Sequence, residues 1–334
     1  MPFRRTDLQP SQEGAEDMTK PRVSIGIPAF KGRHFREALL CWKCQTFADF
    51  EVVVQDDRSP DDLKGIFEAT VGDDLRFAYA RNERATAPNF VDNWMKTLDR
   101  ARGEFFVLGS DDDLYEPDCL EKMVALAEKY PQIEIFDARH DFIGDEGVIR
   151  TCAYGKEVES RIEWLHAVVC GKRFAVAQSV MCRTKALRAI GGFVNLPAAW
   201  GGCDWLTWAR LAKNGIANSA EVLMHWRADG GKTTSVCDPY WVRQKLTAVR
   251  KARPLWKALA ESLDAADERE RHIKQEICDR IVWRFFRWME LCVVDELPPT
   301  EYRREICAAW RRGDLGCWSA LLRLIRSRFG GASR

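Results

Sequence analysis

The chain has 334 residues, of which 46% are hydrophobic and 30% charged, and its 51 Lys and Arg against 50 Asp and Glu leave a net charge of +1. This length suits one large domain or two smaller ones, and the near-neutral charge excludes a protein that binds nucleic acid through bulk positive charge. The 12 cysteines are scattered and follow no secretory signal, so we expect reduced thiols and a cytoplasmic protein. No window reaches the length of about 18 uncharged apolar residues that a membrane-spanning helix requires.

The chain divides into three parts by composition. Residues 1–20 mix charges of both signs with two prolines and no apolar run, which predicts a disordered leader. Residues 21–236 carry alternating strand and helix patterns, and residues 237–334 have an almost continuous helical pattern with breaks expected at Pro254, Pro298-Pro299 and Gly313. We therefore expect an α/β domain over residues 21–236 followed by a helical extension over residues 237–334.

The elements of the first half alternate between strand and helix. β-Branched and aromatic runs predict strands at 23–28, 51–55, 75–80 and 104–109. Apolar residues at helical spacing predict helices at 34–44, 89–102 and 117–130, with another helix starting at Ser59. The later pattern predicts strands at 133–137, 139–143 and 175–183, and a helix at 161–169. Strands that alternate with helices of this length predict an α/β fold with a mostly parallel sheet.

Ligands of such sheets bind outside the carboxyl ends of the strands. Three of these predicted ends carry Pro28-Ala29-Phe30, Asp56-Asp57 and Asp111-Asp112-Asp113. One crevice should therefore gather an apolar segment and two acidic ones.

The acidic run Asp111-Asp112-Asp113 has no basic neighbour in sequence. Adjacent carboxylates repel one another, and a hard divalent cation such as Mg²⁺ or Mn²⁺ relieves this repulsion while it bridges to substrate phosphates. The alternative is an Asp-rich turn that caps the helix after Pro117. The preceding buried strand favours the metal site.

Two further acidic positions have two interpretations each. Asp56 and Asp57 form either an ordinary turn or a site that accepts hydrogen bonds from a nucleobase and a ribose. Asp204 stands in the first turn of a helix after Gly201-Gly202. It is there either a helix-dipole partner or a general base beside tryptophans that offer flat faces to a sugar ring.

The order and spacing of several motifs resemble the inverting family-two glycosyltransferases of the GT-A fold, over about residues 22–235. These motifs are Val23-Ser24-Ile25-Gly26-Ile27-Pro28-Ala29-Phe30, the segment 45–54, Asp56-Asp57-Arg58-Ser59-Pro60-Asp61, Asn82-Glu83 with Asn89, Gly103-Glu104-Phe105 running into Ser110-Asp111-Asp112-Asp113, Tyr115-Glu116-Pro117, Gly191-Gly192-Phe193, and Asp204-Trp205 with Arg210-Leu211-Ala212. The resemblance implies a Rossmann-like GT-A domain that moves a sugar from a nucleotide-diphosphate donor, UDP-sugar favoured, to a glycan or lipid-linked hydroxyl.

The resemblance also implies roles for residues of this chain. Residues expected at the nucleobase and ribose are Pro28, Ala29, Phe30, Asp56 and Asp57. Asp111 is expected at the metal-bound diphosphate, and Asp112 and Asp113 are expected to be the metal ligands. Asp204 matches the family's catalytic base, while Cys203 stands where the family often has Glu and Arg58 stands where it usually has Gly.

Several other residues have weaker signals. Arg227 and Lys232 lie in a segment that resembles the loop closing over the diphosphate, and they either contact the leaving phosphates or belong to a solvated basic loop. His225 is a third metal candidate or a buried strand histidine. Cys41 and Cys44 have redox spacing, but they lie in a predicted helix without a second pair, which favours structural thiols.

The aromatic and arginine-rich segments 281–289 and 318–329 predict helices that pack on the catalytic domain, form a homodimer, or anchor the enzyme peripherally on the inner face of a membrane. Two alternatives to the transferase remain. A metal-dependent nucleotidyltransferase would use the same acidic cluster but needs a basic cluster near the first strand. A non-catalytic glycan or partner-binding protein would keep the fold alone.

Overall fold

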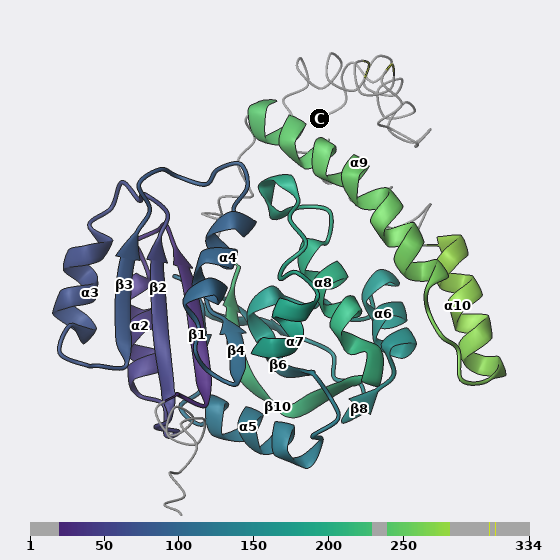
Figure 1. Cartoon of the computed structure of the whole chain (residues 1–334), viewed down its shortest axis with the longest axis horizontal. Helices are drawn as coiled ribbons and strands as arrows, with labels where there is room; N and C mark the ends of the chain where they lie inside the picture. Colours follow the sequence, from purple (N-terminus) through teal and green to yellow (C-terminus); the bar gives the residue numbers. More distant parts are fainter. Residues whose placement is uncertain (1–19, 229–238, 281–306, 308–310, 312–334) are drawn as a thin grey trace, which may run out of the picture.

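The computed structural model describes residues 20–228 and 239–280, together with residues 307 and 311. Within these residues, helices cover both faces of one ten-stranded sheet (Figure 1). The strands are β1 Val23–Ala29, β2 Phe50–Asp56, β3 Phe77–Arg81, β4 Phe105–Leu108, β5 Leu114–Tyr115, β6 Ile135–Gly144, β7 Gly147–Thr151, β8 Val158–Glu159, β9 Val180–Arg183 and β10 Ile216–Arg227. The helices are α2 Phe35–Lys43, α3 Leu63–Val71, α4 Val91–Arg100, α5 Cys119–Lys129, α6 Arg161–Val169, α7 Thr184–Ala189, α8 Cys203–Leu211, α9 Pro239–Glu261 and α10 Glu268–Arg280, with 3₁₀ turns at Ala177–Ser179, Pro197–Ala199 and Ala212–Asn214.

The sheet has a parallel half and a mixed half. Its strand order is β3-β2-β1-β4-β9-β6-β10-β5, with β7 paired to β6 and β8 to β10. The neighbours β3, β2, β1 and β4 are parallel, as the alternation of strands and helices predicts. β9 runs antiparallel to both β4 and β6, while β6 and β10 are parallel. The α/β class is confirmed, and the second half is mixed rather than parallel because β9 enters the sheet in reverse.

Two hydrophobic clusters lie on the two faces of the sheet. One joins α2, α3 and α5 to Ile25, Ile27 and Val54. The other joins α4, α6, α7, α8 and α9 to Phe106 and Leu108. Residues of one strand that join the same cluster are two positions apart, such as Ile25 and Ile27 or Phe106 and Leu108, as the period of two in a strand requires. This packing fixes the carboxyl ends of β1, β2 and β4 at a common edge.

Two predicted elements differ from the structure. The segments 133–137 and 139–143 form one continuous strand, β6, because Ala138 between them is buried and the ladder with β10 continues past it. The predicted strand 175–183 begins with a 3₁₀ turn. There the hydroxyl of Ser179 donates to Asp137 Oδ1 at 2.6 Å and to the carbonyl of Val176 at 3.1 Å, so the chain turns before β9.

The first part of the helical extension packs on the catalytic core. α9 contacts α8 and the turn Pro197–Ala199, and α10 contacts α6 (Figure 1). The break expected at Pro254 is wrong, because α9 continues through this residue while Ala252 and Trp256 on either side are fully buried. Residues 1–19, the breaks at Pro298-Pro299 and Gly313, and the segments 281–289 and 318–329 lie outside the described residues. Among the helices that are described, none is long and apolar enough to cross a bilayer.

Candidate active site

A tight acidic turn follows β4. The hydroxyl of Ser110 donates to Asp112 Oδ1 at 2.5 Å and accepts the backbone N–H groups of Asp112 and Asp113. Asp111 points back to the end of β1, where its Oδ2 accepts the N–H groups of Phe30 and Lys31 at 2.6 and 2.7 Å. The two strand ends are thus tied together, as expected for parallel neighbours.

The three acids of this turn differ in environment. Asp113 is buried, and its Oδ1 accepts the N–H of Arg227 at 2.9 Å. Asp111 and Asp112 are half-buried and line the same pocket. Burial, and then the charge of Asp112, raise the pKa of Asp111 to about 6. Two carboxylates that repel one another in a shared pocket fit a divalent cation, which would remove the repulsion. Over the described residues, no three His, Cys, Asp or Glu side chains come together as a metal-binding group.

The two acids after β2 have different positions. Asp57 lines the pocket beside the acidic turn, and its carboxylate accepts hydrogen bonds from the side chain of Asn82 and from the N–H and hydroxyl of Thr86. Asp56 is fully buried and bonds to Ser59 N, Tyr79 Oη and Arg81. Asp57 therefore faces the pocket, whereas Asp56 holds the turn that carries it.

This acidic pocket has a volume of about 190 Å³. It lies at the carboxyl ends of β1, β2 and β4, where the sequence predicts a crevice. Its lining residues are Pro28, Ala29, Phe30, Lys31, Asp57, Phe90, Asn93, Trp94, Gly109, Ser110, Asp111, Asp112, Asp113, Gln178 and Trp226.

A second pocket surrounds Asp204, with a volume of about 270 Å³. Gly202 begins α8 in the left-handed region, with φ of 72°, and Asp204 follows in the first turn of the helix. Burial raises the pKa of Asp204 to about 6, an effect partly opposed by the backbone N–H groups at the helix start. A carboxylate with this pKa is a stronger base than an ordinary Asp and is still mostly ionised at neutral pH.

The two pockets are neighbours with a shared wall. Trp94, Gln178 and Trp226 line both of them. The acidic turn and Asp204 therefore line adjoining pockets of one composite cleft. A ligand that extends from the acidic pocket past this wall would reach the pocket of Asp204.

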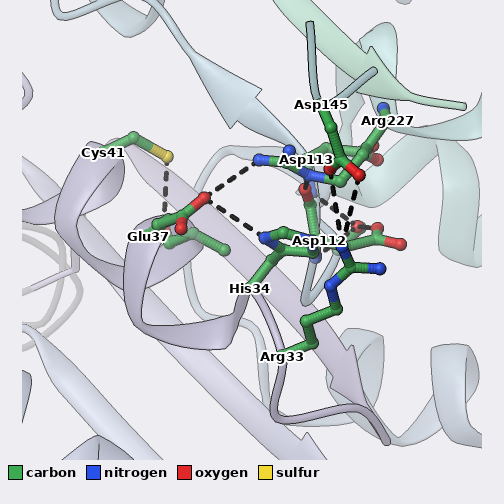
Figure 2. Close-up of polar contacts among 10 residues, drawn as sticks. Arg33, His34, Glu37, Cys41, Asp112, Asp113, Asp145 and Arg227 are labelled. Atoms are coloured by element: carbon green, nitrogen blue, oxygen red, sulfur yellow. Dashed lines mark hydrogen bonds and ion pairs between the residues drawn. The ribbon is translucent and has the colours of Figure 1, made fainter. Parts of the chain in front are cut away.

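Hydrogen bonds from Arg227 hold the acidic turn in position (Figure 2). Its Nε donates to the carbonyl of Asp112 at 2.9 Å, and its Nη2 bonds to Glu37 at 3.0 Å. Glu37 also pairs with His34 at 3.3 Å. The nearby His225 pairs with Glu116 at 2.8 Å and lies 3.8 Å from Asp141. These side chains support the loop around the pocket.

Comparison with known proteins finds a family match over part of the chain. The model described as glycosyl transferase family 2 matches residues 24–181, which contain the acidic turn and the strand ends that build the pocket. This part of the chain is therefore similar to that family. A β-1,3-glucosyltransferase from Campylobacter jejuni, named for the substrate GalNAc(5)-diNAcBac-PP-undecaprenol, is 30% identical over 173 residues, which are 49% of this chain and 54% of that enzyme. An uncharacterized glycosyltransferase from Rickettsia typhi is 33% identical over 111 residues, one third of each chain. The chain thus spans about half or less of these relatives.

Two solved structures share the fold of this chain. S. aureus TarS 1–349 in complex with UDP superposes with a TM-score of 0.57 at 16% identity, over 78% of this chain and 71% of that one. The mannosyltransferase PcManGT from Pyrobaculum calidifontis, in complex with GDP-Man and Mn²⁺, gives a TM-score of 0.54 at 15% identity, over 93% and 80%. The GT-A fold expected from the motifs is confirmed.

The structure brings together most of the residues singled out in the sequence. Those lining the acidic pocket are Pro28, Ala29, Phe30, Asp57, Asp111, Asp112 and Asp113, and Asp204 lines the adjoining one. Asp56 and Arg227 stand behind the acidic pocket, bonded to other protein groups. Lys232 lies outside the described residues. Burial raises the pKa of the Cys41 thiol to about 12, which agrees with a structural thiol.

Sequence reasoning missed three residues that complete the cleft. Asn93 lies on the buried face of α4, Gln178 in the turn before β9, and Trp226 near the end of β10. A polar residue on an apolar helix face was an available signal for Asn93. Nothing in the local sequence distinguishes Gln178, because its position depends on how β9 enters the sheet.

Proposed function

We propose that this protein transfers a sugar from a nucleoside diphosphate donor to a hydroxyl of a glycan or lipid-linked acceptor, with inversion at the anomeric carbon. The main support is the composite cleft, in which a buried acidic turn and a basic carboxylate line adjoining pockets. The names of the relatives agree with this, since one acts on a diphosphate-linked glycan and solved neighbours bind UDP or GDP-mannose.

The acidic pocket would hold the donor. Asp57 would accept from the nucleobase or ribose, next to the backbone of Pro28, Ala29 and Phe30. The side chain of Lys31 lines this pocket and would lie near the diphosphate. Arg227, whose guanidinium bonds within the protein, would act by keeping the acidic turn in position.

We propose that Asp112, with Asp111 beside it, would hold Mg²⁺ or Mn²⁺ together with the donor. When bound, such a cation supplies positive charge beside the departing diphosphate. Asp113 is less suited, because one of its oxygens accepts the N–H of Arg227 inside the protein.

Asp204 would act as the general base. Its carboxylate removes the proton of the acceptor hydroxyl while that oxygen forms a bond to the anomeric carbon, and the bond from this carbon to the diphosphate oxygen breaks with its electron pair. Asp204 and the acidic turn line adjoining pockets that share one wall, which agrees with attack from the face opposite the leaving group and with inversion.

Calorimetry tests the donor site. We expect wild-type protein to bind one of UDP, GDP, CDP and dTDP in a Mn²⁺-dependent manner, and Asp112→Asn to lose the Mn²⁺ dependence. Asp73→Asn is a matched control, because this exposed carboxylate pairs only loosely with Lys43 and lines neither pocket. Absence of binding by folded wild-type protein to all four nucleotides would overturn the proposal.

A further inference from the structure

A third cavity, of about 680 Å³, lies beyond the Asp204 pocket. It is formed by β7, the end of α6, the segment 170–174 and the indole of Trp205. The acidic pocket and the Asp204 pocket are much smaller, at about 190 and 270 Å³. Neither the donor nor the base requires this third cavity.

The cavity is continuous in its lining with the catalytic cleft. Phe174 and Trp205 line both the cavity and the Asp204 pocket, with ring centroids 6.2 Å apart. Phe142 lines the cavity, and its ring centroid lies 5.2 Å from a ring centroid of Trp226, which lines both the acidic pocket and the Asp204 pocket. A wall of aromatic rings thus runs from the acidic pocket past Asp204 into the cavity. Aromatic faces of this kind pack well against the apolar faces of sugar rings.

The charge of the cavity is positive. Its basic residues are Arg150, Lys172 and Arg173. Arg173 is buried and paired with Glu159 at 2.6 Å, so its charge is already neutralised. Arg150 is exposed and lies over the ring of Phe142, 4.0 Å from its centroid, and Lys172 is exposed as well. Among the described residues, neither Arg150 nor Lys172 takes part in an ion pair. Two uncompensated cations match the charge of one phosphate ester, which is about −1.5 to −2 at pH 7.

We propose that this cavity binds the acceptor through a phosphate group on its saccharide, with Arg150 and Lys172 facing the phosphate and Phe174 and Trp205 packing along the sugar toward Asp204. This inference rests on the proposed function, since it names the class of acceptor for the same cleft. The phosphate belongs either to a water-soluble phosphorylated glycan or to the diphosphate of a lipid-linked saccharide. Either source would present negatively charged phosphate oxygens to Arg150 and Lys172.

Binding without turnover tests the cavity. The probes are glucose 1-phosphate, galactose 1-phosphate and N-acetylglucosamine 1-phosphate, with the corresponding methyl glycosides as neutral partners and inorganic phosphate as a further control. Mn²⁺ and a saturating concentration of whichever of UDP, GDP, CDP and dTDP the protein binds keep the donor pocket filled. We expect at least one sugar phosphate to bind at least about tenfold more tightly than its methyl glycoside, and the double variant Arg150→Ala/Lys172→Ala to lose about tenfold or more of this affinity.

The matched control is Arg36→Ala/Lys185→Ala, which removes the same two charges from exposed positions that line none of the three pockets. Equal affinity of the Arg150/Lys172 variant and the control, or equal binding of neutral and phosphorylated sugars, would overturn the proposal. Inorganic phosphate that binds as tightly as every sugar phosphate would also overturn it, because the aromatic wall would then contribute nothing.

A farnesyl diphosphate ester of the same sugar separates the two sources. Tighter binding of this ester, with the same dependence on Arg150 and Lys172, identifies a lipid-linked diphosphate, and equal binding identifies a phosphorylated glycan. Binding of UDP, GDP, CDP and dTDP is measured separately. Sugar-phosphate binding without binding of any of these nucleotides would reject the proposed transferase and keep the cavity, whereas nucleotide binding alone would reject only the cavity.

Discussion

The Nε of Arg227 donates to the carbonyl oxygen of Asp112 at 2.9 Å, and the backbone N–H of Arg227 donates to the carboxylate of Asp113 at the same distance. The end of β10 therefore holds two successive residues of the acidic turn (Figure 2). Glu37 on α2 bonds to the other arm of the guanidinium. The acidic pocket thus depends on a residue more than a hundred positions away in sequence.

Arg227→Lys should weaken nucleotide binding by about tenfold and lower the free energy of unfolding by about 1–3 kcal/mol, because the single ammonium of lysine lacks the planar fork that reaches Asp112 and Glu37 from two different nitrogens. Calorimetry with the nucleotide and urea denaturation measure the two effects. Arg188→Lys is the control, since Arg188 also donates to two acceptors, here the backbone carbonyls of Leu98 and Ala101, but lies outside the pocket. An Arg227→Lys protein that loses stability and keeps its nucleotide affinity would show that the hydrogen bonds of Arg227 have no role in the site.

Asp204 leads to a prediction about pH. Its pKa of about 6 lies above the ordinary 3.8, and only the deprotonated form removes a proton. We expect kcat/KM to fall as the pH decreases through about 6, and Asp204→Asn to reduce kcat by about 10²- to 10⁴-fold while UDP still binds. A pH profile of initial rates measures this. A variant that keeps wild-type kcat would exclude Asp204 as the base.

The same raised pKa predicts an opposite effect on stability. The folded state binds the proton of Asp204 more tightly than the unfolded state, so this group stabilises the fold below pH 4 and the contribution is lost as the pH rises through about 6. Asp204→Asn should therefore unfold with a free energy about 1–3 kcal/mol higher than wild type at pH 8, and with a much smaller gain at pH 4. Asp73→Asn, exposed to solvent, should show no such difference. Equal gains of Asp204→Asn at the two pH values would contradict the prediction.

The sequence predicts the parallel half of the sheet well, because strands such as β2, buried along its whole length, have a strong local signal. It also predicts the acidic turn, since a carboxylate run at the end of a buried strand has few explanations. The direction of β9 was not predictable in this way. That strand is four residues long, and its pairing with β4 and β6 depends on contacts distant in sequence.

The acidic pocket also depends on packing that the local sequence does not show. Asp56 and Asp57 are adjacent in sequence and equally acidic, yet one faces Tyr79 inside the protein and the other the pocket. Alternation along a strand decides which of them faces outward, and its phase is set by the packing of β2. No sequence motif predicted the large cavity beside Trp205, because the residues that line it come from elements separated in sequence, among them β7, α6 and α8.

Asn82 is the centre of a buried polar network that positions Asp57. Its amide donates to Asp57 and Asn93 at 2.7 and 2.8 Å, and its oxygen accepts from Gln55 and Lys96 at 2.9 and 2.7 Å. Asn82→Ala should lower the free energy of unfolding by about 2–3 kcal/mol, because buried partners are left unsatisfied. Nucleotide affinity should decrease as well.

Urea denaturation and calorimetry measure both effects of Asn82→Ala. Asn195→Ala serves as the control, because Asn195 donates to Asp92 in an exposed pair and should cost less than about 0.5 kcal/mol. Comparable losses for the two variants would show that the network contributes nothing beyond a surface contact.

Trp256 connects the helical extension to the base. Its indole Nε1 donates to the carbonyl of Gly201 at 3.0 Å, and Gly201, with φ of +82°, begins the turn that leads to Asp204. α9 approaches this glycine so closely that a Cβ there would lie 3.0 Å from Ala252 Cβ. Trp256→Phe should therefore loosen the start of α8, lowering kcat several-fold with UDP affinity unchanged, because the donor pocket does not contact Trp256.

Trp164→Phe provides the matched control, since Trp164 is equally buried but its indole N–H has no hydrogen-bond partner in the described part of the chain. Both variants lose the same volume from the core, so a fall in kcat confined to Trp256→Phe isolates the hydrogen bond to Gly201, and equal kcat values for the two would rule out a role for α9 in positioning the base.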